Sequence, residues 1–291
     1  MLDNATMVLW VDQPEKVLGM LDVCHEVKDL LTGQLKYHWG KVDGLRFTIN
    51  GKKVKIQNSI HKYFLKDNTG LFTLKQNDLA VEKLSDRIHL DIATAAIPNF
   101  EFGVTFKVAE SPTSYLDKMD SFKSKAFVPF DSCFNRTNIY YQTEAYRYKL
   151  YNKGYEIGDE LLNLIRIEIK RNSKSKYLPH IVTVSDFLQK DNFAGLVREH
   201  LKMFDKVHFS GSQFQIRNGL KANDISLILA LNGVGYPLMR STFKKHCTPK
   251  NYEYHSKRIR KVMRESLLEQ NSPRKYLREE LKENLLYILN N

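Results

Sequence analysis

Hydrophobic and polar residues alternate strictly along several short segments of this chain. The clearest segments are residues 97–107, 145–152 and 164–170. The last reads LIRIEIK, so its isoleucines fall on one side of a pleated strand and its charged residues fall on the other. Each segment is therefore predicted to be an amphipathic strand, with one face in a hydrophobic core and one polar face.

Turn and capping signals place further elements before residue 178. Asn50-Gly51 is a strong two-residue hairpin signal. Asn77 or Asp78 would cap a helix. The predicted strands lie at residues 7–11, as two or three strands between 44 and 64, and at 138–142. The predicted helices lie at residues 14–31, 77–87 and 111–122.

A polar break at residues 172–176 separates this pattern from a helical one. Ser272-Pro273 is a clean helix start, with serine as N-cap and proline in the first turn. The later helices are predicted at residues 183–204, 226–231, 237–247, 251–270 and 272–289. We therefore expect an α+β fold: an antiparallel sheet with helices packed on one face over residues 1–178, followed by a basic helical module over 179–291.

Charge points to a phosphate-bearing partner. The 291 residues carry 45 Lys or Arg against 33 Asp or Glu, a formal charge of +12. A surplus of lysine is also common in proteins that bind no nucleic acid, so the distribution of charge matters more. From Arg240 to the end there are 13 basic and 6 acidic residues, interleaved with aromatic residues as on helices with one basic face. Arg258, Arg260 and Lys261 are the DNA contacts predicted there.

Cysteine usage and hydropathy indicate the compartment. Cys24, Cys133 and Cys247 are widely spaced and form no metal-binding pattern, so we expect reduced thiols and no structural zinc. The N-terminal apolar run lacks a basic region before it, and no apolar stretch approaches the ~20 residues of a membrane span. A cytoplasmic protein is expected. No glycine-rich phosphate loop is present, so we expect neither a nucleotide cofactor nor a fused helicase.

The strand at 145–152 carries a candidate nucleophile. By alternation, Tyr151 shares a face with Lys149 and Lys153, and a neighbouring strand would bring Glu168 close. A phenol can attack a phosphodiester when cations and a divalent metal offset the charge on the phosphorus centre. This pattern favours a phosphodiester-cleaving enzyme.

Three motifs carry a family resemblance: NFEFGV at 99–104, KLYNK at 149–153 and LIRIEIK at 164–170. In this order they resemble rolling-circle replication initiators, specifically plasmid initiators of the Rep_trans type, filamentous-phage gene II proteins and related phage or plasmid replication proteins. SIHKYF at 59–64 is similar to another recurring element of these relatives. The resemblance covers about residues 55–190.

The resemblance implies a metal-dependent DNA nicking and joining enzyme with a 5′-phosphotyrosyl intermediate. Tyr151 would be the nucleophile, and Lys149, Lys153 and Arg166 would stabilise the phosphate. Mg²⁺ or Mn²⁺ would be the cofactor. Its implied ligands are Glu101, Glu168 and Glu156. His61, Lys62 and Lys170 would add DNA contacts. The implied partner is DNA, as a single-stranded or hairpin origin plus flanking duplex, with a second copy of the chain and a host helicase as further partners.

Some positions depart from the family pattern. None of the nine histidines forms the His-hydrophobic-His metal motif of most rolling-circle nucleases, which fits the branch that uses carboxylates. Glu101 stands where aspartate is usual, and either residue suits Mg²⁺ or Mn²⁺. Lys149 stands where arginine is commoner, which keeps the charge but loses bidentate geometry.

Each assignment has a competitor. The nucleophile could instead be Tyr148, although alternation turns it toward the core, or one of Tyr140, Tyr141, Tyr146 and Tyr155. Asp91 competes with Glu101 for the first acidic position. Glu168 could form only a cross-strand ion pair, Glu156 could cap a loop, and His61 could be a core residue. The competing functions are a non-catalytic DNA-binding regulator of a mobile element and a transposase-like metal nuclease that uses water.

Overall fold

In the computed structural model, the described residues are 2–123, 125–129, 137–171, 181–209, 216, 220–266 and 273–291. The strands are β1 (Leu2–Trp10), β2 (Val23–Lys28), β3 (Leu35–Val42), β4 (Leu45–Asn50), β5 (Lys53–Asn58), β6 (Ala96–Lys107), β7 (Met119–Phe122), β8 (Lys125–Ala126), β9 (Val128–Pro129), β10 (Asn138–Gln142), β11 (Tyr146–Asn152), β12 (Leu164–Arg171) and β13 (Val207–Phe209).

Helices connect and cover these strands. The α-helices are α1 (Pro14–Leu18), α2 (Ile60–Leu65), α3 (Leu74–Ile88), α4 (Pro112–Asp117), α5 (Lys153–Ile157), α6 (Val184–Leu188), α7 (Lys190–Phe204), α8 (Ala222–His246), α9 (Pro249–Ser266) and α10 (Pro273–Asn290). Two 3₁₀ turns are η1 (Ile92–Thr94) and η2 (Glu160–Leu162).

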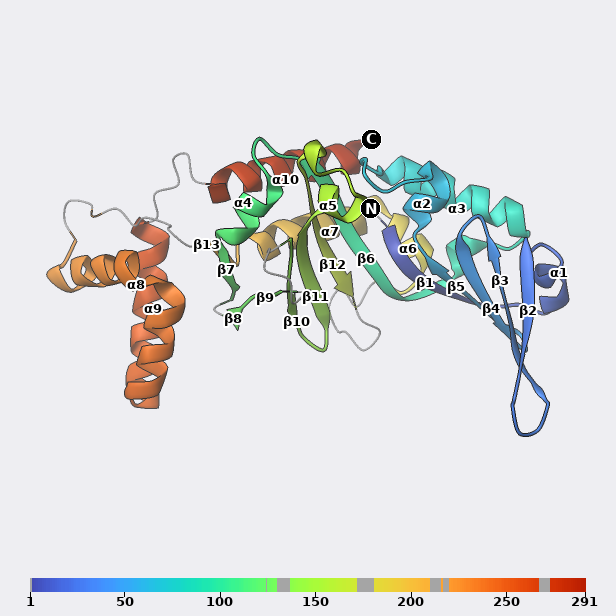
Figure 1. Cartoon of the computed structure of the whole chain (residues 1–291), viewed down its shortest axis with the longest axis horizontal. Coiled ribbons are helices and arrows are strands. Elements are labelled where there is room, and N and C mark those ends of the chain that lie inside the picture. Colours follow the sequence, from blue (N-terminus) through green and yellow to red (C-terminus); the bar gives the residue numbers. More distant parts are fainter. Residues whose placement is uncertain are drawn as a thin grey trace.

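One ten-stranded sheet organises the fold, in the order β2-β3-β4-β5-β1-β6-β12-β11-β10-β9. Its paired strands all run antiparallel. A small second sheet has the order β13-β7-β8. Figure 1 shows the large sheet running across the molecule, with α3, α7 and α10 arranged along it. The expected α+β class, an antiparallel sheet with helices packed against it, is confirmed.

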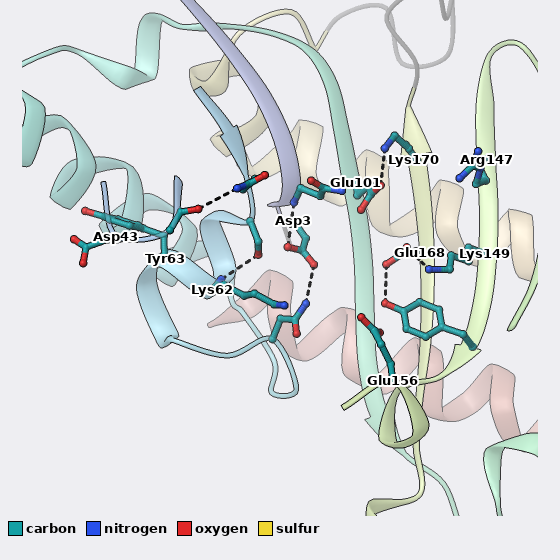
Figure 2. A pocket seen from close by; sticks show the side chains of 16 residues that line it. Asp3, Asp43, Lys62, Tyr63, Glu101, Arg147, Lys149, Glu156, Glu168 and Lys170 are labelled. Atoms are coloured by element: carbon teal, nitrogen blue, oxygen red, sulfur yellow. Dashed lines mark hydrogen bonds and ion pairs between the residues drawn. The ribbon is translucent and has the colours of Figure 1, made fainter. Parts of the chain in front are cut away.

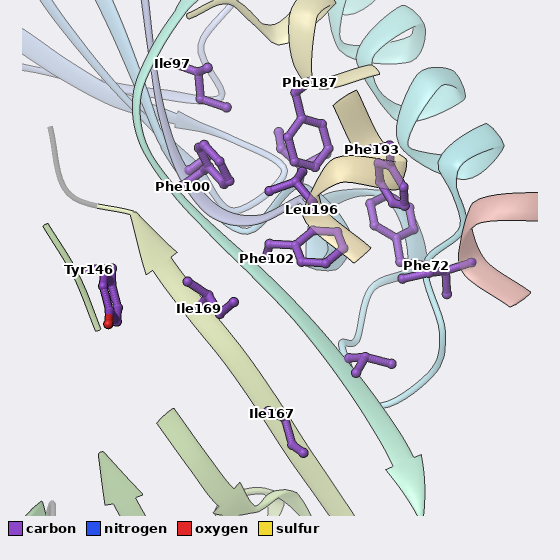
Figure 3. Packing of buried hydrophobic residues seen from close by; sticks show 14 of the residues in the cluster. Phe72, Ile97, Phe100, Phe102, Tyr146, Ile167, Ile169, Phe187, Phe193 and Leu196 are labelled. Atoms are coloured by element: carbon purple, nitrogen blue, oxygen red, sulfur yellow. The ribbon is translucent and has the colours of Figure 1, made fainter. Parts of the chain in front are cut away.

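The core lies between one face of the large sheet and a layer of helices. Phe102 of β6 packs edge-on against Phe193 of α7, with ring centroids 5.3 Å apart, and also contacts Phe187 of α6 (Figure 3). The buried leucines Leu277 and Leu281 of α10 belong to the same core. Alternation therefore predicted correctly which face of β6 and β12 is apolar.

The last helix thus belongs to the sheet's own core, as do α6 and α7. Among the helices that the structure describes, only α8 and α9 have a hydrophobic cluster of their own, which includes Ile228 and Ile259. Figure 1 shows these two helices at the end of the molecule away from β2. The predicted boundary at residue 178 falls between residues 171 and 181 and so lies outside the described residues, as do the predicted polar break at 172–176, Cys133 and the predicted cap Ser272.

Several predicted elements are correct and others are wrong. The hairpin at Asn50-Gly51 joins β4 to β5, and β10 has the predicted bounds. The helix predicted over residues 14–31 is wrong, because it ends at Leu18 and residues 23–28 form β2. The segment predicted as a strand up to residue 64 instead becomes α2, which Ser59 caps. Thr73, rather than Asn77 or Asp78, caps α3 through a capping box.

Candidate active site

Three cross-strand rows of polar residues cross β6, β12 and β11 on the face opposite the core. The pairing register sets them side by side, because residues directly opposite in neighbouring strands share a face. The rows are Glu101–Lys170–Arg147, Gly103–Glu168–Lys149 and Thr105–Arg166–Tyr151. The register therefore brings together the tyrosine, two of the three predicted carboxylates (Glu101 and Glu168) and the predicted cations Lys149, Arg166 and Lys170.

A pocket of about 460 Å³ opens on this face (Figure 2). Its lining combines five carboxylate side chains with lysines and two tyrosines; among these residues are Asp3, Asp43, Lys62, Tyr63, Glu101, Lys149, Tyr151, Glu156, Glu168 and Lys170. Glu101, Tyr151 and Glu168, which come from three strands, line the same pocket as the sequence predicts. Their roles in it stay predictions.

Tyr151 presents its hydroxyl to a carboxylate. Its side chain is 4% exposed, and its hydroxyl donates a hydrogen bond of 3.3 Å to Oε2 of Glu168. Burial, followed by the charge of Glu168, raises the pKa of the phenol above its ordinary value. Lys149 Nζ lies 4.1 Å from the centre of the tyrosine ring, a cation–π contact. The phenol is therefore protonated at rest, with a proton acceptor already in contact.

Glu168 reaches this position because its strand neighbour has no side chain. Gly103 pairs directly with Glu168, and a Cβ added to Gly103 would lie 2.7 Å from the Cβ of Glu168. No Cβ fits at that distance without movement of β12. A glycine in the middle of a strand often marks such a close approach.

Arg166 lies beneath the pocket, which corrects its predicted role. It was expected to stabilise the phosphate, but its side chain is completely buried and does not line the pocket. Its guanidinium binds Oε2 of Glu168 at 2.9 Å, Oδ2 of Asp3 at 2.5 Å and Oγ1 of Thr105 at 2.9 Å. It also donates to the backbone carbonyl of Asn68. Arg166 therefore orients the carboxylates from below and is a positioning residue.

Nearby carboxylates keep the buried guanidinium of Arg166 ionised. Burial alone would lower the pKa of the Arg166 guanidinium, but Glu168, Tyr151 and Asp3 together raise it above its ordinary value. Burial would likewise raise the pKa of Asp3, but the charge of Arg166 and the hydrogen bonds from Ser59 and Asn68 together lower that pKa. A buried ion pair persists when each charge is matched and hydrogen-bonded, as here.

The two lysines beside Tyr151 differ in position. Lys149 lines the pocket, and its Nζ lies 3.8 Å from Oε1 of Glu168. Lys153 was expected to continue the strand on the same face, but Asn152 caps α5 and the strand ends there. The Lys153 side chain is buried, with its Nζ 6.0 Å from the centre of the Tyr151 ring and 3.0 Å from Oε2 of Glu156. Of the two, only Lys149 is placed to meet a ligand in the pocket.

Glu101 is the second predicted carboxylate of the pocket. Lys170 pairs with it across the strands and its Nζ lies 2.9 Å from Oε1 of Glu101. Burial and the charge of Glu168 raise the pKa of Glu101, against the opposing effect of Lys170. Two carboxylates that repel each other through a pocket are a favourable place for a cation.

The predicted three-carboxylate metal set is not met. Among the residues that the structure describes, no three His, Cys, Asp or Glu side chains converge to hold a metal ion. Glu156 lies on α5, half exposed, where it pairs with Lys153. Mg²⁺ often keeps several waters and uses only one or two protein carboxylates. Glu101 and Glu168 fit that simpler arrangement.

His61 is a core residue. Its ring is completely buried and stacks on Phe72, with centroids 4.7 Å apart. Burial lowers its pKa to about 4, so the ring is neutral at pH 7. The expectation that it contacts DNA is therefore wrong. Its neighbour Lys62 is exposed and lines the pocket, so this position remains available for a phosphate contact.

Competing residues lie elsewhere. Tyr148 packs in the core near Phe122 and His200, as alternation predicts. Tyr155 is 48% exposed on α5 and does not line the pocket. Asp91 caps the turn η1 through the backbone N–H of Ala93. None of these side chains lies beside Glu168 as Tyr151 does.

Sequence reasoning missed three contributors to the site. Asp3 reaches Arg166 because β1 carries a bulge between Asp3 and Thr6, with Asn4 in the left-handed region at φ 42°. Asn68 donates from a loop to Asp3. Tyr63 lines the far side of the pocket. A bulge and a loop leave no periodic signal, although SIHKYF at 59–64 pointed to this region.

The basic residues predicted on the helical hairpin have unequal roles. Arg258 of α9 pairs with Asp224 of α8 at 2.7 Å and so ties the two helices together. Arg260 and Lys261 are exposed. Only the latter two present their charge outward for a phosphate.

Comparisons with known proteins add little. No family model and no curated protein matches the chain. One solved structure is similar, a rolling circle replication initiator protein from Geobacillus stearothermophilus, at 14% sequence identity and a TM-score of 0.41. The match covers 77% of this chain and 89% of that one. Within the described part of the chain, no helix is long and apolar enough to cross a membrane. The function proposed below therefore rests on the pocket and the sequence motifs.

Proposed function

We propose that this protein nicks and joins DNA through a tyrosyl-phosphate intermediate, as a rolling-circle replication initiator. One observation carries the proposal: the hydroxyl of Tyr151 donates to Glu168 inside a pocket that Lys149 and Lys170 also line. A nucleophile, a base that touches it and nearby cations are the parts that such a transfer requires. The order of the KLYNK and LIRIEIK motifs agrees with this assignment.

The covalent step balances without an external reactant. The phenolic oxygen of Tyr151 attacks the phosphorus of a DNA phosphodiester, and the bond from phosphorus to the 3′ oxygen breaks. Glu168 takes the phenolic proton and returns it to the departing 3′ oxygen. The products are a 5′-phosphotyrosyl link and a free 3′ hydroxyl. The link keeps the energy of the broken bond, so the reverse attack by a 3′ hydroxyl rejoins DNA.

The raised pKa of Tyr151 sets the timing of proton transfer. Because the phenol stays protonated in the free protein, the proton moves only as the phosphate is attacked, as in general base catalysis. The hydrogen bond of 3.3 Å is longer than the 2.5–3.0 Å usual for O–H···O contacts. Such bonds commonly tighten when substrate binds.

Charge in the pocket stabilises the pentacoordinate phosphorus. Lys149 lies beside both reacting groups, and Lys62 and Lys170 line the same pocket. A Mg²⁺ or Mn²⁺ ion held by Glu101 and Glu168 would polarise the scissile phosphate. Arg166 fixes the position of Glu168 from below. Arg260 and Lys261 on α9 would hold flanking duplex through its phosphates.

The proposal is tested by covalent capture on DNA. A pool of random-sequence single-stranded oligonucleotides is incubated with the protein and Mn²⁺, and adducts that survive denaturant are recovered and sequenced. We expect the native protein and Tyr155→Phe to form adducts of a common sequence. Tyr151→Phe, which loses only the phenolic oxygen, should form none.

Tyr155→Phe is the matched control, because Tyr155 lies four residues from Tyr151 and outside the pocket. Cleavage by Tyr151→Phe that leaves a free 5′ phosphate would overturn the tyrosine mechanism and favour a nuclease that uses water. DNA binding by the native protein with neither adduct nor cleavage would favour a non-catalytic regulator.

A further inference from the structure

The face of the sheet that carries the pocket continues over β1 to β5, and no helix among the described residues buries its side chains there. Apolar residues of these strands point to the core: Phe47, Val54 and Ile56 are completely buried. The alternate residues point the other way and are exposed or half-exposed. This outward face, here called the platform, comprises Trp10, His25, Tyr37, Trp39, Lys41, Arg46, Lys53 and Lys55.

Aromatic rings are concentrated on the platform. Trp39 stacks on His25 of the neighbouring strand, with centroids 4.6 Å apart and planes inclined by 25°. Trp10 is 75% exposed. Tryptophan is enriched on surfaces that bind partners, because its large ring supplies much contact area. Both tryptophans of the chain lie here.

Cations accompany these rings. The guanidinium of Arg46 lies 5.3 Å from the ring centre of Trp39, and Nζ of Lys53 lies 5.9 Å from that of Trp10. Lys41 pairs with Arg46 across the strands, and Lys55 lies one strand further on. No carboxylate belongs to the platform, so its charge is entirely positive at neutral pH.

The platform leads directly to the pocket. Lys41, Arg46, Gln57, Thr6 and Asn99 form one cross-strand row from β3 to β6. Asn99 precedes Glu101 by two residues on β6, a step of about 7 Å along a strand. The turn between β3 and β4 also lines the pocket through Asp43 and Gly44. A chain lying on the platform would therefore arrive at Tyr151 and Glu168.

We propose that the platform binds single-stranded DNA and guides it to the pocket. Stacking of bases on aromatic rings, combined with cations that follow the backbone, is the usual basis of single-strand binding. In a duplex the base faces are covered by their neighbours, so the tryptophans could not stack on them. The destination of the strand rests on the function proposed above, but binding to the platform does not depend on cleavage.

Tryptophan fluorescence reports on this surface directly, because the chain has only two tryptophans and both belong to the platform. Trp10→Phe leaves Trp39 as the reporter, and Trp39→Phe leaves Trp10. We expect a 20-nucleotide oligothymidylate to quench both single-tryptophan proteins in a saturable way. The matched thymine-adenine duplex should quench them much less. Absence of quenching by the single strand, or equal quenching by the duplex, would overturn the proposal.

Affinity measurements with the same oligothymidylate provide the second test. Trp39→Ala should weaken binding by roughly 5- to 100-fold, the effect of losing one stacked base, whereas Trp39→Phe should retain most of it. Arg46→Gln should also weaken binding and reduce its salt dependence. Lys28→Gln is the control, because Lys28 is equally exposed but falls on the opposite side of β2. Equal affinity of all variants would overturn the proposal.

The two proposals fail independently. If the platform variants bind single strands normally while adduct formation still requires Tyr151, only the platform proposal is refuted. If a Tyr151 variant still cleaves DNA while single strands still quench the tryptophans, only the tyrosine mechanism is refuted. Circular dichroism and the unfolding temperature of each variant distinguish a loss of binding from a loss of folding.

Discussion

At the residue scale, the site depends on one buried arginine. Arg166 connects Asp3 of β1, Thr105 of β6 and Glu168 of β12, so three strands contribute to the position of one carboxylate. Removing one partner of such a network leaves another charge buried and unpaired, which costs several kcal/mol. This network therefore positions Glu168 beside the hydroxyl of Tyr151, which its proposed role as a base requires.

Glu101 gives a pH-dependent prediction. Its pKa is raised by burial and by Glu168, so the folded state binds its proton more tightly than the unfolded state does. The native protein should consequently lose stability as pH rises from the ordinary pKa of 4.5 through the higher pKa of Glu101. Above both values the loss should be complete and constant.

Glu101→Gln cannot ionise and should lack this loss. Urea unfolding of both proteins at pH values from 4.5 to 7.5 measures the difference in their free energies of unfolding. We expect the variant to gain stability relative to the native protein across this window. A difference that is independent of pH would show that Glu101 titrates normally.

Alternation along the strands was enough to predict part of the site. It placed Glu101, Tyr151 and Glu168 on one face and turned Tyr148 to the core. It could not predict the depth of a side chain, so the complete burial of Arg166, which was expected to stabilise the phosphate, was missed. Periodicity also says nothing about Asp3, which reaches the site through a bulge.

At the element scale, β6 contributes Glu101 to the site and pairs with β12, the strand that carries Glu168. Gly103 lets β6 and β12 approach closely under Glu168. Gly103→Ala should cost about 1–3 kcal/mol of stability, because the new methyl group overlaps a strand neighbour. It should also reduce adduct formation, since Glu168 must move away from Tyr151. Chemical denaturation and the capture assay measure the two effects.

Gly195→Ala is the matched control for that change. Gly195 lies in α7, and a Cβ there would meet only the end of the Arg198 side chain, at 3.8 Å. Alanine should stabilise this helix by up to about 1 kcal/mol and leave adduct formation unchanged. If Gly103→Ala behaved in the same way, the close approach at Glu168 would have no importance for the site.

Elements were predicted best where packing follows the local pattern. The strands β10 and β12 and the hairpin of β4 and β5 have clear alternation and turn signals. The helix predicted over residues 14–31 failed because residues 23–28 pair with β3 at the edge of the sheet, a long-range contact that local propensity does not encode. The burial of α10 in the sheet's core is non-local for the same reason.

At the scale of the whole molecule, the basic helices divide into two roles. Arg258 holds α9 to α8, whereas Arg260 and Lys261 face outward. Replacing Arg260 and Lys261 with glutamine should weaken binding to any duplex by a similar factor and reduce the magnitude of the salt slope by about 2. Titrations at several salt concentrations, with duplexes of different sequence, measure both quantities.

Arg258→Gln is the informative contrast. It should loosen the pairing of α8 with α9, detectable as a lower unfolding temperature, in addition to any effect on DNA. Loss of binding to one sequence alone, with an unchanged salt slope, would mean that Arg260 and Lys261 read bases.

The most direct test of the account is the chemical identity of the protein–DNA link. The denaturant-resistant adduct is digested with nuclease and protease, and mass spectrometry locates the residue that carries the nucleotide. We predict a phosphotyrosine ester at Tyr151, joined to the 5′ side of the cleaved strand. A nucleotide on another tyrosine, or cleavage with no covalent link at all, would contradict the account.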